Sequence, residues 1–514
     1  MNVNKLKEKI TLHPIMAILL MIGGTIVLSG ILALIGVQAT SKTISTTSLE
    51  YNTYIAEVSS LFSLSGLKYI FTTTIANFVS FVPLSSLIIV LIGIGVMQKS
   101  EFLKVIFTIL TKNAKKINVT FILVLISIFL GVIGDLSFII LLPISAILFE
   151  VGKRNPTIGI IASFAGLTCG YGINIVFTSM DSSLLSLSTL AANIVDPNYT
   201  MKTTGFVFIM LVVSLALAYL ITQITERYII YKVDKYEIPT SEVEEEVFLG
   251  KKEKKGLALA FLAFMVYMFI FIYNIIPGLP FSGNFLDQSQ VFYIDKLFSY
   301  NSFFNKGFVF IVTFGMVLVG MFYGMGAGTI KNHRELCENL GHSLDGIGQV
   351  IVTIFFASIL INVFKYTNIG SVIVTALTSL LNNTTFTAIP LIVLLFFVSA
   401  VATLFVPSSL ARWQIISAVA LPIFMEAGLS PEFTQIIFRF GESASLGLTP
   451  LFAYFVIYLA FLEKYNQKKE TIHILKAIKY QLPFAIATFT LLLTIVIVWY
   501  IVGLPIGVGV FPTL

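Results

Sequence analysis

Long apolar runs dominate the chain and predict a bundle of membrane-spanning helices. A spanning helix needs about 20 mainly apolar residues, and about nine runs fit a single crossing. The runs lie at residues 14–37, 82–97, 157–181, 205–224, 256–276, 307–325, 347–364, 431–462 and 483–502. The stretch 366–383 is ambiguous and fits either an interfacial or a broken helix.

Two further apolar runs, 119–149 and 387–427, predict re-entrant hairpins. Basic residues flank the first run on both sides, so the positive-inside rule places both of its ends in the cytoplasm. This run is too short for two crossings, which need about 40 residues. We therefore expect its tip, "GVIGDLS", to bring Asp135 to membrane depth. The second run is interrupted by "FVPSSLARW" and enters from outside, although two complete spans would give the same topological parity.

The same order of segments occurs in both halves of the chain. Each hairpin is followed by a proline, Pro156 or Pro431, and then by a span that small polar residues and an acid interrupt. This order is typical of inverted repeats whose broken helices meet near the middle of the bilayer. The expected organisation is a first repeat at 1–226, a charged cytoplasmic linker at 227–255 and a second repeat at 256–514.

Composition supports a polytopic, all-α membrane protein and excludes several functions. The chain is 57% hydrophobic and 11% charged, whereas soluble domains carry about 25% charged residues. The short alternating strands of a β-barrel are not evident. The net charge of +6 comes from loop lysines, which indicates a cytoplasmic N-terminus, an external C-terminus and no nucleic-acid partner. Neither a P-loop nor a metal-ligand motif is seen, so we expect no cofactor and an ion gradient as the energy source.

Two interruptions of the apolar pattern predict where a solute and an ion bind. The first lies near Gly170 and Asn174, and the second between Ser443 and Pro450. Non-helical backbone at membrane depth is tolerated only where it is buried in protein or lines a wet cavity. Carbonyl groups freed at such breaks can coordinate a cation, and half-helix N-termini favour an anion. Ser408 and Ser409, at the tip of the second hairpin, have the right position for that second role.

The stretch "FRFGESASLGLTP" places two charges, Arg439 and Glu442, on one helix face at membrane depth. They could form an ion pair that only locks the helix, because a lone charge there costs at least about 2.5 kcal/mol. The helix-breaking residues that follow favour a functional site instead. Asp181 could sit simply at the outer interface, and Asp135 could cap a helix. Trp413 fits an interfacial belt residue or a surface on which an aromatic solute stacks.

Several blocks are similar to the p-aminobenzoyl-glutamate transporter (AbgT) family. They are "GDLSFIILLPISAILFEVGKRNP", "GYGINIVFTSMDSSL", "DPNYTM", "YGMGAGTIK", "PSSLARW" and "FRFGESASLGLTPLFAYF", in the family's order over nearly the whole chain. The resemblance implies a homodimer of nine-span subunits with two hairpins in a cell membrane. It also implies ion-coupled import of aminobenzoyl-glutamate or export of sulfonamide antimetabolites, with Na⁺ or H⁺ as the coupling ion.

The resemblance also implies roles for single residues. The positions thought to line the substrate path match Asp181, Trp413, Arg439 and Pro450, and Asn174 matches as well. Three positions depart from the family pattern. Glu442 occupies a position where the family has Asp, Leu410 one where a serine is expected, and Leu446 one where the family usually has asparagine. A site that loses hydrogen-bonding partners can bind a different or less polar ligand.

The leading hypothesis is therefore a secondary transporter for a small anionic aromatic solute. Arg439, Trp413, Ser408, Ser409 and Pro450 would bind the solute. The coupling ion would bind at Asp181, Glu442 and Asn174. The alternatives are a carrier for dicarboxylates or other organic anions, an intramembrane enzyme and a channel. An Asp135–Asp181 protease dyad lacks the glycine expected where Val132 stands, and no selectivity-filter repeat is visible.

Overall fold

The computed structural model confirms the predicted helical membrane architecture, to which it adds one pair of strands. It describes residues 13–44, 50–237, 250–382, 384, 387–467 and 471–514. Within these ranges, 10 helical segments are long and apolar enough to cross a bilayer. Eight of them coincide with predicted spans, and the other two are the first arms of the predicted hairpins. Residues 1–12 at the N-terminus and 238–249 of the predicted linker lie outside the described residues.

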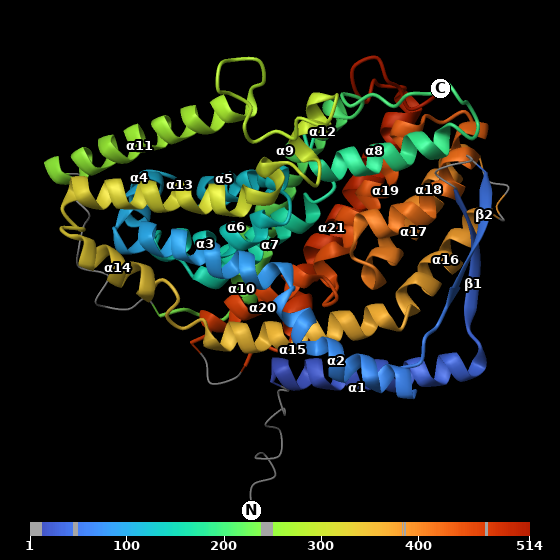
Figure 1. The fold of residues 1–514 in the computed structure, drawn as a ribbon, viewed down its shortest axis with the longest axis horizontal. Coiled ribbons are helices and arrows are strands. Elements are labelled where there is room, and N and C mark those ends of the chain that lie inside the picture. The colour runs from blue at the N-terminus through green and yellow to red at the C-terminus, as the bar shows by residue number, and fades with distance from the viewer. Residues whose placement is uncertain (1–12, 45–49, 238–249, 383, 385–386, 468–470) are drawn as a thin grey trace, which may run out of the picture.

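The first half of the chain contains both arms of the first hairpin and the first broken span (Figure 1). Its elements are α1 (Pro14–Ile35), β1 (Gln38–Ile44), β2 (Tyr51–Glu57), α2 (Leu64–Val79), α3 (Val82–Lys99), α4 (Phe102–Lys112), α5 (Lys116–Phe129), the 3₁₀ turn η2 (Leu130–Ile133), α6 (Leu136–Val151), α7 (Pro156–Cys169), α8 (Ser179–Ala192), α9 (Val207–Ile224), the π-helical turn η3 (Thr225–Ile229) and α10 (Ile230–Lys232).

The second half repeats this order of hairpin and broken span after six helices, α11 to α16. Its elements are α11 (Lys251–Ile275), α12 (Tyr293–Phe298), α13 (Phe303–Ala327), α14 (His333–His342), α15 (Gly348–Tyr366), α16 (Ile369–Asn382), α17 (Ala388–Phe405), α18 (Ser409–Glu426), α19 (Pro431–Ser445), the 3₁₀ turn η5 (Leu446–Leu448), α20 (Ala453–Lys464) and α21 (Ile474–Val502).

Both predicted hairpins are helix–turn–helix units, and the same local chemistry builds each of them. The second arm contains an internal proline, Pro143 in α6 and Pro422 in α18. The broken helix that follows starts with a proline whose fixed φ suits the first helical position. Its N-cap side chain, from Asn155 or Ser430, accepts a backbone N–H of the first turn. That the two units are re-entrant, and that they enter the bilayer from opposite sides, stays a prediction.

The structure adds a β-hairpin where the sequence predicted no element. Strands β1 and β2 pair antiparallel, with Gln38 opposite Glu57, and β1 packs against α16 and α18. Its β-branched and aromatic side chains suit a strand, but their pattern is too short and polar to stand out. The ambiguous stretch 366–383 contains one regular helix, α16.

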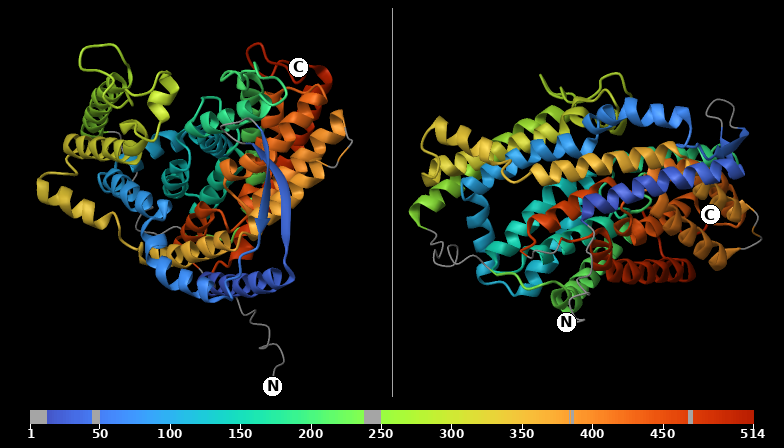
Figure 2. Two further views of the ribbon diagram at one scale, coloured as in Figure 1. Left: turned by 45° about the vertical axis from the view of Figure 1, so that its right-hand side comes forward. Right: turned by 90° about the horizontal axis from the view of Figure 1, so that it is seen from below.

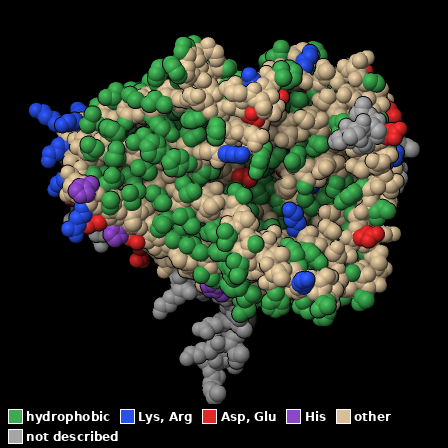
Figure 3. All heavy atoms as spheres, viewed as in Figure 1, with side chains coloured by type: hydrophobic (Ala, Val, Ile, Leu, Met, Phe, Trp, Pro, Cys, Tyr) green, Lys and Arg blue, Asp and Glu red, His purple; other side chains and the backbone are tan. Residues whose placement is uncertain are grey.

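Helix α13 packs on both α11 and α3 at one side of the molecule, away from α16–α19 (Figure 2). Only 11% of the residues in the most apolar stretch of α11 are buried, as expected for a helix that faces lipid. Hydrophobic side chains accordingly cover much of the face in Figure 3, with basic ones at its left edge. The close contact of α11 with α13 needs glycine, since a Cβ on Gly326 would lie 2.7 Å from the Cα of Gly256.

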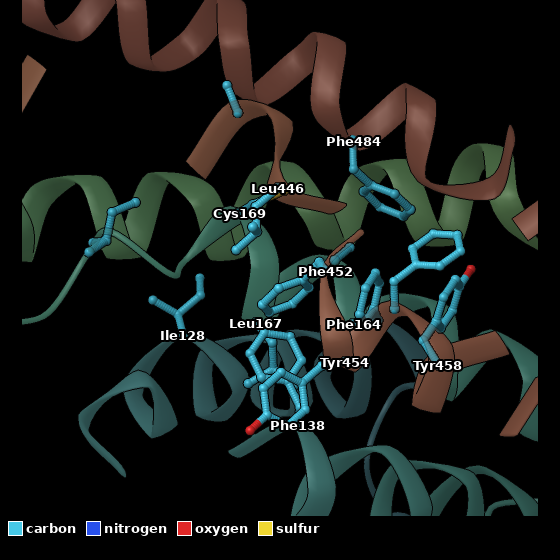
Figure 4. Packing of buried hydrophobic residues seen from close by; sticks show 14 of the residues in the cluster. Ile128, Phe138, Phe164, Leu167, Cys169, Leu446, Phe452, Tyr454, Tyr458 and Phe484 are labelled. Atoms are coloured by element: carbon cyan, nitrogen blue, oxygen red, sulfur yellow. The ribbon is translucent and has the colours of Figure 1, made fainter. Parts of the chain in front are cut away.

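Aromatic packing joins the two halves around the first broken helix (Figure 4). Phe138 of α6 stacks on Tyr454 of α20, with ring centroids 5.1 Å apart. Phe164 of α7 stacks on Tyr458 of α20 at 4.2 Å. Such pairs contribute about 0.5–1.5 kcal/mol each beyond simple burial. The half-helix α20 is therefore held against α6 and α7, which fixes the second break beside the first.

Glycine at position 326 should be required for packing of α11 on α13. We expect Gly326→Ala to lower the stability of the folded protein by about 1–3 kcal/mol, because its methyl group would overlap backbone of α11. Gly341→Ala in α14 is the matched control, because nothing lies within 4 Å of its added Cβ. The measurement is the thermal midpoint of the detergent-purified protein. Equal midpoints for the two variants would contradict the described contact.

Candidate functional site

The two predicted helix breaks are confirmed, and they lie against each other. The first separates α7, which ends at Cys169, from α8, which begins at Ser179. The second separates α19 from α20 and contains η5. The backbone N–H of Gly172, in the first break, donates to the hydroxyl of Ser443 at 2.9 Å. The site therefore lies where the two broken helices meet.

Small polar residues in the second break replace hydrogen bonds that the helices have lost. The hydroxyl of Ser445 donates to the carbonyl of Ala400 at 2.7 Å. The hydroxyl of Thr449 donates to the carbonyl of Leu404, also at 2.7 Å. The last carbonyls of a helix have no partner within it, so the second bond satisfies one near the end of α17. These residues thus attach the break to the first arm of the second hairpin.

Arg439 is buried where the two broken helices meet, and one nitrogen of its guanidinium group makes no hydrogen bond within the described residues. Its side chain is 3% exposed and lies 3.6 Å from the carboxylate of Asp181. Its Nη2 donates to the carbonyl of Tyr171 at 3.0 Å, and its Nε to that of Gly172 at 3.5 Å. Carbonyls that we expected to be free for a cation are thus bound to Arg439. Its Nη1 has no hydrogen-bond partner within the described residues.

Asp181 belongs to the site rather than to the outer surface, because its side chain is 15% exposed and faces Arg439. It lies in the first turn of α8, where it forms a capping box with Thr178. Its Oδ2 accepts from the N–H and hydroxyl of Thr178 at 3.0 and 2.7 Å, and from the amide of Asn174 at 3.4 Å. The side-chain oxygen of Asn174 has no partner among the described residues.

Glu442 is paired with Arg412 of α18, and not with Arg439. The Glu442 and Arg412 side chains are both 0% exposed, with 2.5 Å between Oε1 and Nη2. The hydroxyl of Ser409 also donates to Oε1, and Arg412 donates to Thr403. The alternative of an ion pair between Arg439 and Glu442 within α19 is therefore wrong, because each charge reaches a different neighbouring element. Arg412 was missed as the partner, although it lies one turn after Ser409 and shares its helix face.

Trp413 is completely buried between α8 and α19. Its indole N–H donates to the hydroxyl of Ser188 at 2.8 Å, and that hydroxyl donates to Gln435 at 2.7 Å. Its ring lies 4.4 Å from that of Phe438, between ring centroids. Ser408 is the N-cap of α18 and accepts the N–H of Ala411 at 3.4 Å. In this conformation neither Trp413 nor Ser408 lines a cavity at the breaks, and nor does Pro450.

Two cavities adjoin Arg439. The larger, of about 1430 Å³, extends from the tip of the first hairpin and the first break to α11 and α13. The smaller, of about 20 Å³, is lined by Asp181, Asn174, Gln435 and Arg439 among others. A void of about 10–15 Å³ is enough for one water molecule. The predicted residues Asn174, Asp181 and Arg439 are thus brought together around space for a solute and for a small ion.

The buried ion pair should show strong coupling when its charges are removed singly. We expect Arg412→Met or Glu442→Gln alone to lower stability by about 3–5 kcal/mol, since each leaves the partner's charge buried. The double variant should regain much of that loss. The exposed pair Arg334–Glu338, at 3.0 Å, is the matched control and should couple by less than about 0.5 kcal/mol. Thermal midpoints give the comparison, and simple additivity for the buried pair would contradict it.

The chain matches the AbgT transporter family over residues 2–514. It is 25% identical over 504 residues to the p-aminobenzoyl-glutamate transport protein of Escherichia coli K12, which covers 98% of this chain and 94% of that protein.

Two solved structures are similar to this chain. The MtrF protein of Neisseria gonorrhoeae, described in a class of antimetabolite efflux pumps, is 25% identical with a TM-score of 0.50 over 98% of both chains. The YdaH transporter of Alcanivorax borkumensis is 23% identical with a TM-score of 0.48 over 96% of this chain and 100% of that one. The chain belongs to the AbgT transporter family and is a multi-pass membrane transporter rather than an enzyme.

Proposed function

We propose that this protein is an ion-coupled secondary transporter of a small anionic aromatic solute. Aminobenzoyl-glutamate and sulfonamide-type antimetabolites are the candidate solutes, because one relative is named for the first and another for antimetabolite efflux. The observation that carries the proposal is Arg439, a buried guanidinium that lines a cavity of about 1430 Å³ with Nη1 unpartnered. We place the protein in the cell membrane as a homodimer, with its N-terminus in the cytoplasm and its C-terminus outside.

Arg439 has the properties that an anion site needs. An arginine side chain is always charged and presents five donors that suit a carboxylate. Two of its nitrogens are already fixed by carbonyls of the first break, so the guanidinium is held in place before a solute arrives. The remaining donor gains a partner only when an anion binds, and burial strengthens that hydrogen bond.

Trp413 would stack on the solute ring only after α8 and α19 separate. In this structure the indole N–H is hydrogen-bonded to Ser188 of α8, and the indole ring contacts Phe438 of α19. The separation that frees Trp413 would also move Asp181 of α8 away from Arg439 of α19. Binding of the aromatic ring and release of Arg439 would therefore belong to one conformational change. Ser408, Ser409 and Pro450 would line the solute path in that second conformation.

The small cavity is the proposed place of the coupling ion, Na⁺ or H⁺. Asp181 and Asn174 supply oxygen atoms to it, and the Asn174 oxygen has no partner within the described structure. Glu442 would act through its Oε2, which has no hydrogen-bond partner within the described residues. Alternating access would come from movement of the hairpins and broken helices against α3, α11 and α13. The large cavity lies between these two groups of helices.

A dicarboxylate or another organic anion is the second candidate solute. Leu446 is buried in the second break, and Leu410 lies in the first turn of α18. Neither leucine can form the hydrogen bond that the family's serine or asparagine would offer at its position. We therefore expect this protein to bind a polar aromatic solute more weakly than a family member with those residues. A flux assay with aminobenzoyl-glutamate, a sulfonamide and simple dicarboxylates distinguishes the two solute classes.

Removal of the guanidinium should stop transport without unfolding the protein. In proteoliposomes, we expect Arg439→Ala to lower the initial rate of solute uptake at least about tenfold, because a charged hydrogen bond to the anion contributes about 1.5–3 kcal/mol. Arg439→Lys should recover only part of the rate, since lysine lacks the forked geometry. Arg334→Ala in the exposed part of α14 should transport normally. Normal uptake by Arg439→Ala would end the assignment.

Asp181 should couple transport to the ion gradient. We expect Asp181→Asn to abolish uptake against a concentration gradient under imposed Na⁺ or H⁺ gradients, because the variant loses the negative charge that offsets Na⁺ and the carboxylate that can take up H⁺. Downhill exchange of solute should survive at a reduced rate. Asp196→Asn, in the exposed loop before α9, is the control. If concentrative uptake persists in Asp181→Asn at the wild-type level, the coupling ion binds elsewhere.

A further inference from the structure

The first hairpin carries an acid that the proposed transport cycle does not use. Asp135 lies in the turn between α5 and α6 and lines the large cavity. It occupies the N-cap position of α6, but its side chain makes no capping hydrogen bond. The hydroxyl of Ser137 donates to the carbonyl of Gly134 at 2.7 Å and so stabilises the turn in its place. The helix-capping role considered from the sequence is therefore wrong, and the carboxylate is available for another purpose.

Two tyrosine hydroxyls orient this carboxylate. Tyr171, in the first break, donates to Oδ1 of Asp135 at 3.0 Å. Tyr454, in the first turn of α20, also hydrogen-bonds to the Asp135 side chain. Phe138 and Phe452 contact both tyrosine rings, with centroids 5.1 to 6.3 Å apart, and so limit their movement. The acid is thus held rigidly by residues of three elements that meet at the cavity wall.

The carboxylate keeps capacity to accept further hydrogen bonds. An ionised carboxylate offers about four acceptor positions, and two hydroxyl donors leave some of them open. Within the described residues, no lysine, arginine or histidine forms a salt bridge with Asp135. Its side chain is exposed to the cavity rather than enclosed by protein. A ligand with an N–H group can therefore reach it.

Tyr171 links Asp135 directly to the anion site. Its backbone carbonyl accepts from Arg439 at 3.0 Å, while its hydroxyl donates to Asp135 at 3.0 Å. Both charged residues line the same cavity. The Asp135 carboxylate and the Arg439 guanidinium are thus separated by the length of one tyrosine residue. That spacing suits a solute with a carboxylate at one end, an aromatic ring between and an N–H donor at the other end.

We propose that Asp135, oriented by Tyr171 and Tyr454, binds the N–H donor end of a solute whose carboxylate lies at Arg439. The chemical class is an aryl amine or similar nitrogen donor joined through its ring to an anionic group. This inference rests on the proposed function, because it needs a solute in the large cavity. It adds a second, acidic subsite that selects among aromatic anions by their nitrogen substituent.

The test compares two probes that differ by one amino group, N-(4-aminobenzoyl)-L-glutamate and N-benzoyl-L-glutamate. Their dissociation constants are measured by calorimetry on the full-length purified protein. Wild type should bind the amino compound about tenfold or more tightly than the other, which is the size expected for one hydrogen bond to a charged group. Asp135→Asn should reduce that preference, because a neutral amide oxygen accepts a weaker hydrogen bond than a carboxylate, and should leave binding of N-benzoyl-L-glutamate within about twofold of wild type.

Further variants keep the test decisive. Asp135→Ser is a second removal of the carboxylate, in case the asparagine variant does not fold. Tyr454→Phe removes one donor but leaves the acid, so the preference should persist. Asp345→Asn, in an exposed loop after α14, is the control and should behave as wild type. An unchanged preference in both Asp135 variants would overturn the subsite while leaving the proposed function intact. Failure of wild type to bind either probe would overturn the proposed function, and the subsite with it.

Discussion

The structure depends on compensation of two arginine charges buried among apolar helices. Arg412 and Arg439 lie at 0% and 3% side-chain exposure, where an isolated charge costs several kcal/mol. Arg412 is compensated by Glu442 and the hydroxyl of Thr403 in the second hairpin. Arg439 is compensated by the Asp181 carboxylate and by two carbonyls that a continuous first helix would not offer. The break in one helix and the charge in the other therefore require each other.

This mutual requirement explains why the helix breakers follow the charges in the sequence. Ser443 accepts an N–H of the first break, while Ser445 and Thr449 attach the second break to α17. The aromatic pairs of α20 then hold the second half-helix against α6 and α7. The outcome is a polar centre in which four side chains, Arg439, Asn174, Arg412 and Glu442, each keep one atom without a hydrogen-bond partner among the described residues. These atoms belong to residues that line the cavities or form the buried ion pair. Such atoms suit a site that completes its hydrogen bonds with cargo.

The sequence predicted the segments well because their signals are local. Apolar length defined the spans, and glycine, proline and serine defined both breaks within a few residues. Partners could not be predicted in the same way. Arg439 and Glu442 lie on one helix face, yet one reaches the first break and the other reaches α18. Which neighbour a side chain meets depends on how distant helices pack, and spacing along one chain does not contain that information.

A similar limit applies to the solute site. The sequence identified Arg439, Asp181 and Asn174, which line the cavities, but it offered no sign that Tyr171 and Tyr454 converge on Asp135. It also suggested an exposed stacking role for Trp413, which is enclosed between α8 and α19 in this conformation. A transporter alternates between packings, so a residue buried in one of them can still contact solute in another.

The most direct measurement is an electron cryomicroscopy structure of the protein with bound N-(4-aminobenzoyl)-L-glutamate. The account predicts density in the large cavity, with the carboxylate at Nη1 of Arg439 and helix interrupted at both 170–178 and 446–452. Solute density away from Arg439, or continuous helix through either break, would contradict it.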